Sequence, residues 1–364
     1  MPYAAALRRL VAAGLGGGAL AWKASHSLAE EKGKGESAAS FGSDVYAVYR
    51  PEGAGDGTRV LLAADYEDMI EDFRRKTCRL VILGETHGDR VAHFLEKRVF
   101  DDLASSTPKC GLSMEMFESD KQQVLNEYLR GLIPESSMLK DCRAWANYRR
   151  DYRPIVEAAK NQGLPVFAAN APGRYVGLVN RSGQEALLAL GEDGRALLPP
   201  LPFRMPSEAL RWKVFDFMNA QKYNSNSSQP ACPAQAQAEE VNPALSRMVE
   251  AQSLWDASMA WTLAELLKAG ECSKVVHLCG RFHVEHGLGI PEHLEGYLRS
   301  NHCESTLASF DRNDSSAAFR SVAKTAVFVP AEFSADGRPS IDLDALAYSA
   351  DWVVLTDASK STLL

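Results

Sequence analysis

The sequence predicts an α/β protein in which helices flank a mostly parallel central sheet. Three observations support this class. Short apolar runs that contain β-branched residues recur along the chain, as is typical of strands buried on both faces of a parallel sheet. Segments with apolar residues at helical spacing separate these runs, which favours right-handed strand–helix–strand crossovers. With 364 residues, 46% of them hydrophobic, the chain is long enough to bury the core that such a sheet requires.

The expected elements follow in chain order within one folded domain, residues 45–364. The expected strands cover residues 80–83, 110–117, 164–169, 275–279, 302–309, 326–329 and 352–356. The expected helices cover residues 65–75, 90–104, 120–132, 154–162, 208–221 and 244–269, and the helical pattern over 174–198 is interrupted. Pro154 suits the first turn of its helix. A smaller helical insertion is expected at about 205–250, with a mobile, low-complexity loop at 223–243.

Two of the apolar runs end in the same pattern, a glycine followed three residues later by a histidine. The runs lead into the sequences GETH (84–87) and GRFH (280–283). Parallel strands put their carboxyl ends on one edge of a sheet, where open α/β sheets bind ligands. We therefore expect both turns to face one cleft at that edge. Glu115, near the end of the expected strand 110–117, should join them there.

The residues of this cleft suit acid–base or metal chemistry. The candidate catalytic residues are Glu85, His87, Glu115 and His283. His87, Glu115 and His283 would also suit a divalent metal, with zinc, manganese and iron all open. A bound metal would lower the pKa of a water and support hydrolysis, whereas the same residues without metal can act as a general acid and base. A structural alternative stays open, in which Glu85 caps the following helix and His87 bonds to a loop.

Composition and charge exclude some other classes. The formal net charge of -7 argues against a nucleic-acid-binding surface, which would require a concentrated basic face. The seven cysteines include no Cys-x-x-Cys pair, so a cysteine zinc site and a full disulfide framework are both disfavoured. This cysteine usage favours a reducing compartment.

Residues 1–29 are expected to form a targeting peptide. The segment contains the early arginines Arg8 and Arg9, and no acidic residue precedes Glu30, so the segment resembles an organelle transit peptide. A mitochondrion is slightly favoured over a chloroplast because serine is sparse, and an exported or periplasmic protein is the alternative. The apolar stretch 10–22 is short and glycine-rich for a membrane span, but membrane association through it stays open. Residues 30–44 are expected to be a disordered linker.

Six segments, in order along the chain, resemble the ChaN-like haem-binding uptake family of the Tiki superfamily. They are LGETH (83–87), MEMF (114–117), WANYRRDYRPIVEAAKNQGLPVFAANAP (145–172), AQSLWDASMA (251–260), GRFHVEHGLGIPEHL (280–294) and ADWVVLTD (350–357). Both glycine–histidine motifs and the intervening glutamate also look like those of Tiki-type hydrolases. The chain departs from the bacterial members in lacking a lipid-acceptor cysteine after its apolar segment, and its insertion at 223–243 is longer than the family requires.

The resemblance implies haem as the cofactor. An iron porphyrin requires a tyrosinate or imidazole ligand, an apolar slot and cations for its propionates. The candidate cofactor-binding residues are Tyr148, Tyr152, Arg153, Asn170, Arg174, Tyr175 and Asp256. The tyrosines are the candidate iron ligands, the arginines would hold the propionates, and Asp256 would line the main cleft. The alternative is an aromatic stripe that packs against the sheet beside solvated arginines.

The favoured function is therefore haem or tetrapyrrole binding and handling in an organelle. The alternative is a metal-dependent hydrolase that uses His87, Glu115 and His283. A third reading is a scaffold with a vestigial cleft. The sequence leaves a homodimer open.

Overall fold

The computed structural model describes residues 45–53, 58–225, 243–299, 322–334, 339–357 and 359–360. The expected targeting segment, the expected linker, the expected strand 302–309 and most of the loop 223–243 lie outside these residues. No helix within the described ranges has both the length and the apolar character that a membrane crossing requires.

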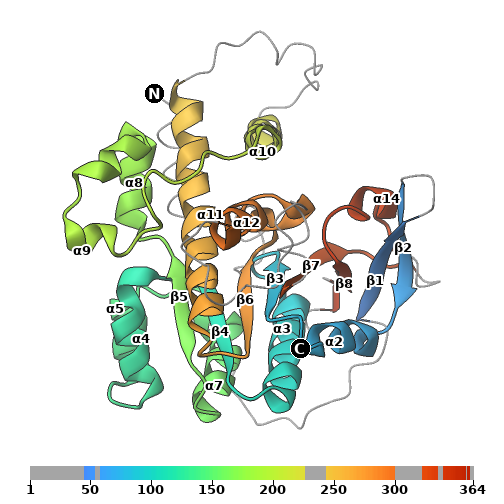
Figure 1. Ribbon diagram of the computed structural model, residues 1–364. Coiled ribbons are helices and arrows are strands. Elements are labelled where there is room, and N and C mark those ends of the chain that lie inside the picture. The colour runs from blue at the N-terminus through green and yellow to red at the C-terminus, as the bar shows by residue number, and fades with distance from the viewer. Residues whose placement is uncertain are drawn as a thin grey trace.

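An eight-stranded sheet forms the centre of the molecule (Figure 1). Its strands are β1 (Tyr46–Gly53), β2 (Arg59–Ala64), β3 (Leu80–Glu85), β4 (Cys110–Glu118), β5 (Val166–Asn170), β6 (Lys274–Gly280), β7 (Ala323–Ala331) and β8 (Trp352–Asp357). The order across the sheet is β2-β1-β8-β7-β3-β6-β4-β5. Strands β3 to β8 run parallel to one another, whereas β1 is antiparallel to both of its neighbours, β2 and β8. The expected fold class is confirmed.

The hairpin of β1 and β2 is absent from the sequence-based expectations. Its residues are mostly half-exposed or exposed, so the segment lacks the continuous apolar run that marks the central strands. Pro51 also argues against a strand, because proline cannot donate to a sheet ladder. In the structure, Pro51 pairs with β2 but lies beyond the residues of β1 that pair with β8.

Helices cover both faces of the sheet. They are α2 (Tyr66–Arg74), α3 (Arg90–Ser106), α4 (Gln122–Leu129), α5 (Glu135–Asp141), α6 (Tyr148–Asp151), α7 (Arg153–Asn161), α8 (Gly173–Ser182), α9 (Glu192–Arg195), α10 (Glu208–Ser225), α11 (Pro243–Ala269), α12 (Ile290–Arg299) and α14 (Leu343–Leu346). Strand side chains alternate between the faces. Val81 and Leu83 pack into the core with α2, α3 and α7, whereas Leu80 and Ile82 pack into the core with α11 and α12.

The long helix α11 joins the sheet to a smaller group of helices. Its C-terminal half packs on the sheet, while Ala251, Leu254 and Ala257 share a separate apolar core with α8. Figure 1 shows α8 and α9 beside α11, on the side away from β1 and β2. Helix α10 and the start of α11 lie within the span 205–250, where the helical insertion is expected.

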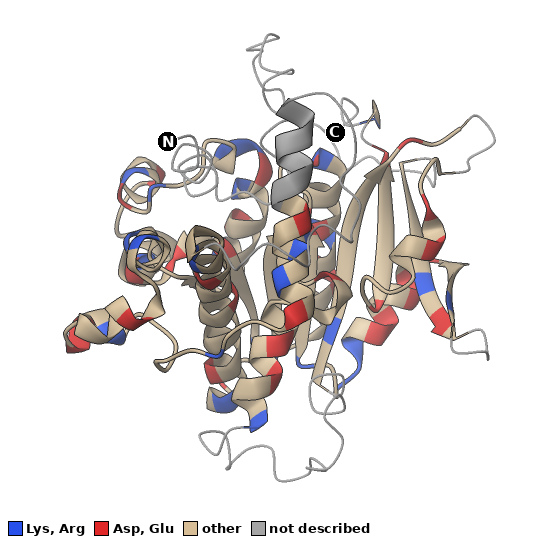
Figure 2. Ribbon diagram, turned by 90° about the horizontal axis from the view of Figure 1, so that it is seen from above, with Lys and Arg blue, Asp and Glu red and all other residues tan. Residues whose placement is uncertain are grey.

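Charged residues lie mainly on the helices and loops, with the two signs interspersed (Figure 2). The core strands carry few charges, and those near their carboxyl ends therefore stand out. Strands β3, β6, β4 and β5 are parallel neighbours in this order, as expected, so their carboxyl ends share one edge.

Candidate functional site

The first glycine–histidine turn follows β3 directly. Glu85 is the last residue of that strand, and His87 lies in the turn before α3. Asp89 is the N-cap of α3, because its side chain accepts hydrogen bonds from the backbone of Val91 at 3.0 Å and Ala92 at 3.2 Å. The alternative in which Glu85 caps this helix is therefore wrong.

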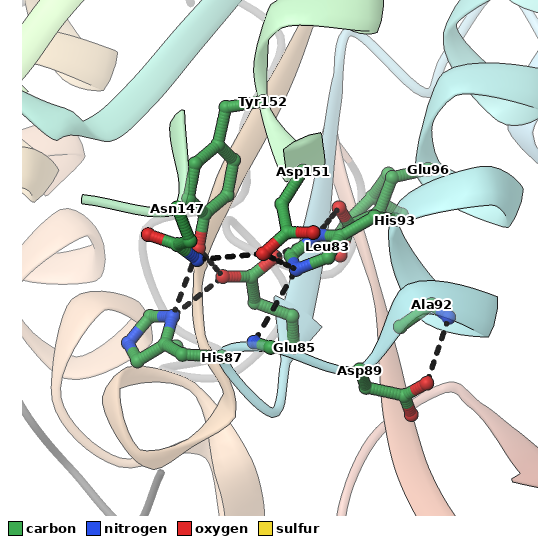
Figure 3. A network of polar contacts seen from close by, with 12 residues as sticks. Leu83, Glu85, His87, Asp89, Ala92, His93, Glu96, Asn147, Asp151 and Tyr152 are labelled. Carbon is green, nitrogen blue, oxygen red and sulfur yellow. Dashed lines mark hydrogen bonds and ion pairs between the residues drawn. The ribbon is translucent and has the colours of Figure 1, made fainter. Parts of the chain in front are cut away.

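Glu85 is a buried carboxylate with several partners (Figure 3). Its Oε1 accepts hydrogen bonds from His87 Nδ1 at 2.5 Å and from the Tyr152 hydroxyl at 2.5 Å, and its Oε2 lies 3.0 Å from His93 Nδ1. Burial raises the pKa of Glu85, but the nearby charge and hydrogen bonds of His93 and His87 outweigh it and lower that pKa overall. Glu85 is thus an ionised group that orients His87.

The other ring nitrogen of His87 lies on the side of Glu115. A Cβ added to Gly280 would fall 2.8 Å from His87 Nε2 and 3.7 Å from Glu115 Oε2, so only glycine leaves room for this approach. The backbone N–H of Gly280 donates to Glu115 Oε2 at 2.7 Å. Burial lowers the pKa of His87, but the hydrogen bond and charge of Glu85 raise it above its ordinary value. The Trp145 ring meets the imidazole edge-on, with 5.0 Å between ring centroids.

The second turn repeats this arrangement. His283 Nδ1 lies 2.5 Å from Asp256 Oδ1, and His283 Nε2 lies 3.5 Å from Glu115 Oε1. Burial lowers the pKa of His283, but the charges of Glu115 and Asp256 raise it to about 10. Burial raises the pKa of Glu115, whereas His283 and His87 lower it overall. The edge thus holds an ionised glutamate between two histidines, each backed by its own carboxylate.

Two other expected residues serve the scaffold. Asn170 donates to the backbone carbonyl of Glu115 at 3.1 Å and accepts from the backbone of Ala171 at 2.9 Å, so it ties β5 to β4. Asp256 is fully buried beneath His283. The expected gathering of side chains at this edge is observed, and these two residues are buried within it.

The expected haem ligands differ in exposure. Tyr148 and Tyr152 are 2% and 0% exposed, and their hydroxyl groups point into the protein. Burial raises the pKa of both, and nearby carboxylates raise it further. Tyr175 is partly exposed, with the Arg174 guanidinium 4.4 Å from its ring centroid. Arg174 and Arg153 lie at the surface, paired with Asp120 and Glu135 respectively.

Sequence reasoning missed three polar residues behind Glu85. His93 and Glu96 project from α3, and Asp151 ends α6; all three are buried. Within the described ranges, the ligand atoms of Glu85, His93 and Glu96 all lie within 4.8 Å of one another. No other group of three described His, Cys, Asp or Glu side chains meets this criterion, including the expected set His87, Glu115 and His283. The spacing of His93, Glu96 and Phe100 along one buried helix face was the available signal.

Comparisons with known proteins identify a family and solved structures to which the chain is similar. A family model described as "Haem-binding uptake, Tiki superfamily, ChaN" matches residues 73–294. The structure titled "Cofacial heme binding to ChaN of Campylobacter jejuni" is similar with a TM-score of 0.54 and 16% identity, over 86% of this chain and 98% of that chain. A second, titled "The structure of the type III effector HopBA1", has a TM-score of 0.36 and 12% identity, over 77% and 88%. No curated protein matches the chain in sequence.

Proposed function

The chain belongs to the ChaN family of haem-binding uptake proteins in the Tiki superfamily, and from this premise we propose that it binds haem or a related tetrapyrrole. The observation that carries the proposal is the family match over residues 73–294, which spans both glycine–histidine turns and the strand edge between them. The similar Campylobacter jejuni protein is described as binding haem cofacially.

The residues at this edge fit the chemistry of an iron porphyrin. Such a ligand requires a nitrogen or oxygen donor, an aromatic or apolar surface and a cation for its propionates. Tyr175 is the proposed iron ligand, because it is partly exposed whereas Tyr148 and Tyr152 are buried. Arg174 beside it supplies the cation. His87, with its edge-on contact to Trp145, is the competing donor.

A haemin titration tests this proposal. We expect a shifted Soret band that saturates at a fixed stoichiometry, and Tyr175→Phe should change the position of the band. Tyr148→Phe is the matched control, since it removes the same oxygen from a buried ring and should leave the band in place. If the Soret band is unchanged in Tyr175→Phe but changes in His87→Gln, the iron ligand is His87 and not Tyr175. Absence of saturable binding would reject haem as the ligand.

A specific observation favours hydrolysis as a second candidate function. Two carboxylate-backed histidines flank Glu115, an arrangement that places a proton donor and a proton acceptor side by side. His283 is protonated at neutral pH, because its pKa is raised to about 10, whereas Glu115 is ionised because its pKa is lowered. Glu115 would act as the base towards a water molecule and His283 as the acid. A divalent metal at these residues is the metal-dependent form of this proposal.

An esterase assay tests the hydrolysis proposal. It measures turnover of the activated ester p-nitrophenyl acetate with and without added zinc or manganese. We expect Glu115→Gln and His283→Gln to lower the rate at least about 100-fold if these groups act as base and acid. Loss of turnover on chelation alone would assign the metal-dependent form. A protein with neither haem binding nor turnover would match the scaffold reading.

The proposed compartment rests on the sequence of residues 1–29 alone. We propose import into an organelle, with a mitochondrion slightly ahead of a chloroplast. Mass spectrometry of the protein from its own cells should place the mature start between Lys23 and Asp44. An intact Met1 peptide on the bulk of the protein would instead support a retained anchor or a different destination.

A further inference from the structure

A second polar cluster lies between the end of β3 and helix α3 (Figure 3). We propose that Glu85, His93 and Glu96 bind a divalent transition-metal ion in the protein interior. This site is separate from the proposed haem ligand Tyr175, and it differs from the expected metal ligands at the cleft. Its three side chains are 1%, 6% and 1% exposed, so an ion there would be shielded from solvent.

The donor atoms have the spacing that an ion requires. His93 Nδ1 lies 3.0 Å from Glu85 Oε2 and 3.0 Å from Glu96 Oε2, and all three residues offer a ligand atom within 4.8 Å of the others. Two ligands at right angles, each about 2.1 Å from a metal, lie about 3.0 Å apart. Hydrogen bonds have the same length, so the distances permit an ion and a second observation must favour it.

That observation is a buried oxygen without a partner. Glu96 Oε1 accepts no hydrogen bond from any residue of the described ranges, although the side chain is almost wholly buried. Buried carboxylate oxygens are normally paired, since removing them from water without a partner is costly. A cation held between Glu96 and Glu85 would supply the partner. Glu85 is already fixed for this role, because His87 and Tyr152 occupy its Oε1 and leave its Oε2 towards His93.

The charges of the cluster balance with a divalent ion. Asp151 is neutralised by Arg150, whose Nε lies 2.6 Å from its Oδ1. Without an ion, a proton on His93 Nδ1 lies between the Glu85 and Glu96 carboxylates. A metal on Nδ1 would replace this proton, and an ion of charge +2 would then offset both carboxylates. Two carboxylates and one imidazole suit manganese, iron(II) or zinc better than calcium or magnesium, which prefer oxygen ligands alone.

The side chains beside His93 also resemble those that orient a metal-bound histidine. Metal-bound histidines usually donate their other N–H to a carboxylate or a carbonyl. His93 Nε2 lies 3.7 Å from Asp151 Oδ2, and Asp151 is itself held by Asn147 at 2.8 Å. With an ion on Nδ1, the Nε2 proton would point to Asp151. The backbone N–H of Gly88, now 3.3 Å from Nε2, would have to move away.

Metal analysis of haem-free, full-length protein tests the site. After dialysis against a chelator and return of zinc or manganese, we expect close to one ion per chain. Glu96→Gln and His93→Gln should lose at least 90% of this metal. His283→Gln, a change in the neighbouring cleft, is the control and should retain it. Retention in Glu96→Gln with loss in His283→Gln would place the ion at the cleft and overturn the proposal.

Wild-type stability gives a readout that does not depend on how the variants fold. Zinc at about 100 times its dissociation constant should raise Tm by about 5 °C over the chelated protein. The shift should vanish in Glu96→Gln if that variant folds. No retained metal and no Tm shift in the wild-type protein with either ion would overturn the proposal, and the haemin titration would be unaffected by that result.

Discussion

The two glycine–histidine turns share a motif and an edge of the sheet, but they differ in what lies behind them. In both, a carboxylate holds Nδ1 and the Nε2 side lies towards Glu115. Behind His283 there is one carboxylate, Asp256, set in helix α11 among apolar residues. Behind His87 there is Glu85, which also contacts a buried group of further titratable side chains on α3 and α6.

The comparison separates what the motif determines from what its neighbours determine. The motif places a histidine at the end of a parallel strand, and a buried carboxylate fixes its direction in both turns. The neighbours decide whether that carboxylate stands alone or belongs to a larger set of charges. We therefore expect a change in the second turn to act on few groups, mainly His283, Asp256 and Glu115, and a change in the first turn to be shared among more groups.

The largest expected effect follows from removing the carboxylate behind each histidine. Asp256→Asn leaves the buried His283 imidazolium with Glu115 alone, and we expect a loss of about 3 kcal/mol in the free energy of unfolding. Glu85→Gln should cost less, about 1–2 kcal/mol, because Glu96 and Asp151 remain close to His93. Urea unfolding of both variants measures the difference. An equal or larger loss in Glu85→Gln would contradict the shared-charge description of the first turn.

The pH dependence of stability should also report on the second turn. The pKa of His283 is raised to about 10 in the folded protein, above its ordinary value. Its contribution to stability is therefore fully present below about pH 6.5 and is lost as the pH rises through about 10. We expect a decrease on the order of 2–3 kcal/mol across this window. His283→Gln should flatten the decrease, and an unchanged profile in that variant would assign it to other groups.

Substituting the glycine that begins each motif should destabilise the first turn more than the second. A Cβ on Gly84 would lie 2.6 Å from a Val284 methyl and 3.0 Å from the Arg281 backbone, neither of which can move freely. We expect Gly84→Ala to cost about 2 kcal/mol through overpacking. A Cβ on Gly280 would have side-chain atoms alone as its nearest neighbours, chiefly those of the His87 ring. Gly280→Ala should cost about 1 kcal/mol, yet displace His87 and abolish any ester hydrolysis. Equal costs in thermal unfolding would contradict this distinction.

The sequence predicted the buried strands of the fold better than its exposed parts. The strands that position the site are buried on both faces, so their apolar runs identified them, and their shared edge followed from the parallel crossovers. The β1–β2 hairpin was not predicted because it is half-exposed. The burial of His93 and Glu96 was not predicted for a different reason. A helix face is read from its apolar residues, so polar residues on that face are assigned to solvent unless a buried partner is known.

The smallest expected effect comes from two neighbouring buried tyrosines, Tyr148 and Tyr152. Their substitution tests whether the polar side chains around Glu85 are energetically coupled. The Tyr148 hydroxyl has no hydrogen-bond partner among the described residues, whereas the Tyr152 hydroxyl donates to Glu85 at 2.5 Å. Removing an unpaired buried hydroxyl is close to neutral, so Tyr148→Phe should change the free energy of unfolding by less than about 0.5 kcal/mol or increase it slightly. Tyr152→Phe should cost about 1.5 kcal/mol, because a hydrogen bond to a charged acceptor is lost.

The two changes delete the same atom from rings that both lie in the core, so each controls for the other. Double-mutant cycles then sharpen the result. Tyr152→Phe combined with Glu85→Gln should cost less than the sum of the single changes, since both act on one hydrogen bond. Tyr148→Phe combined with Glu85→Gln should be additive within about 0.5 kcal/mol. Additivity in both cycles would mean that the Tyr152 contact contributes little, and that the first turn resembles the second, where fewer groups share a change.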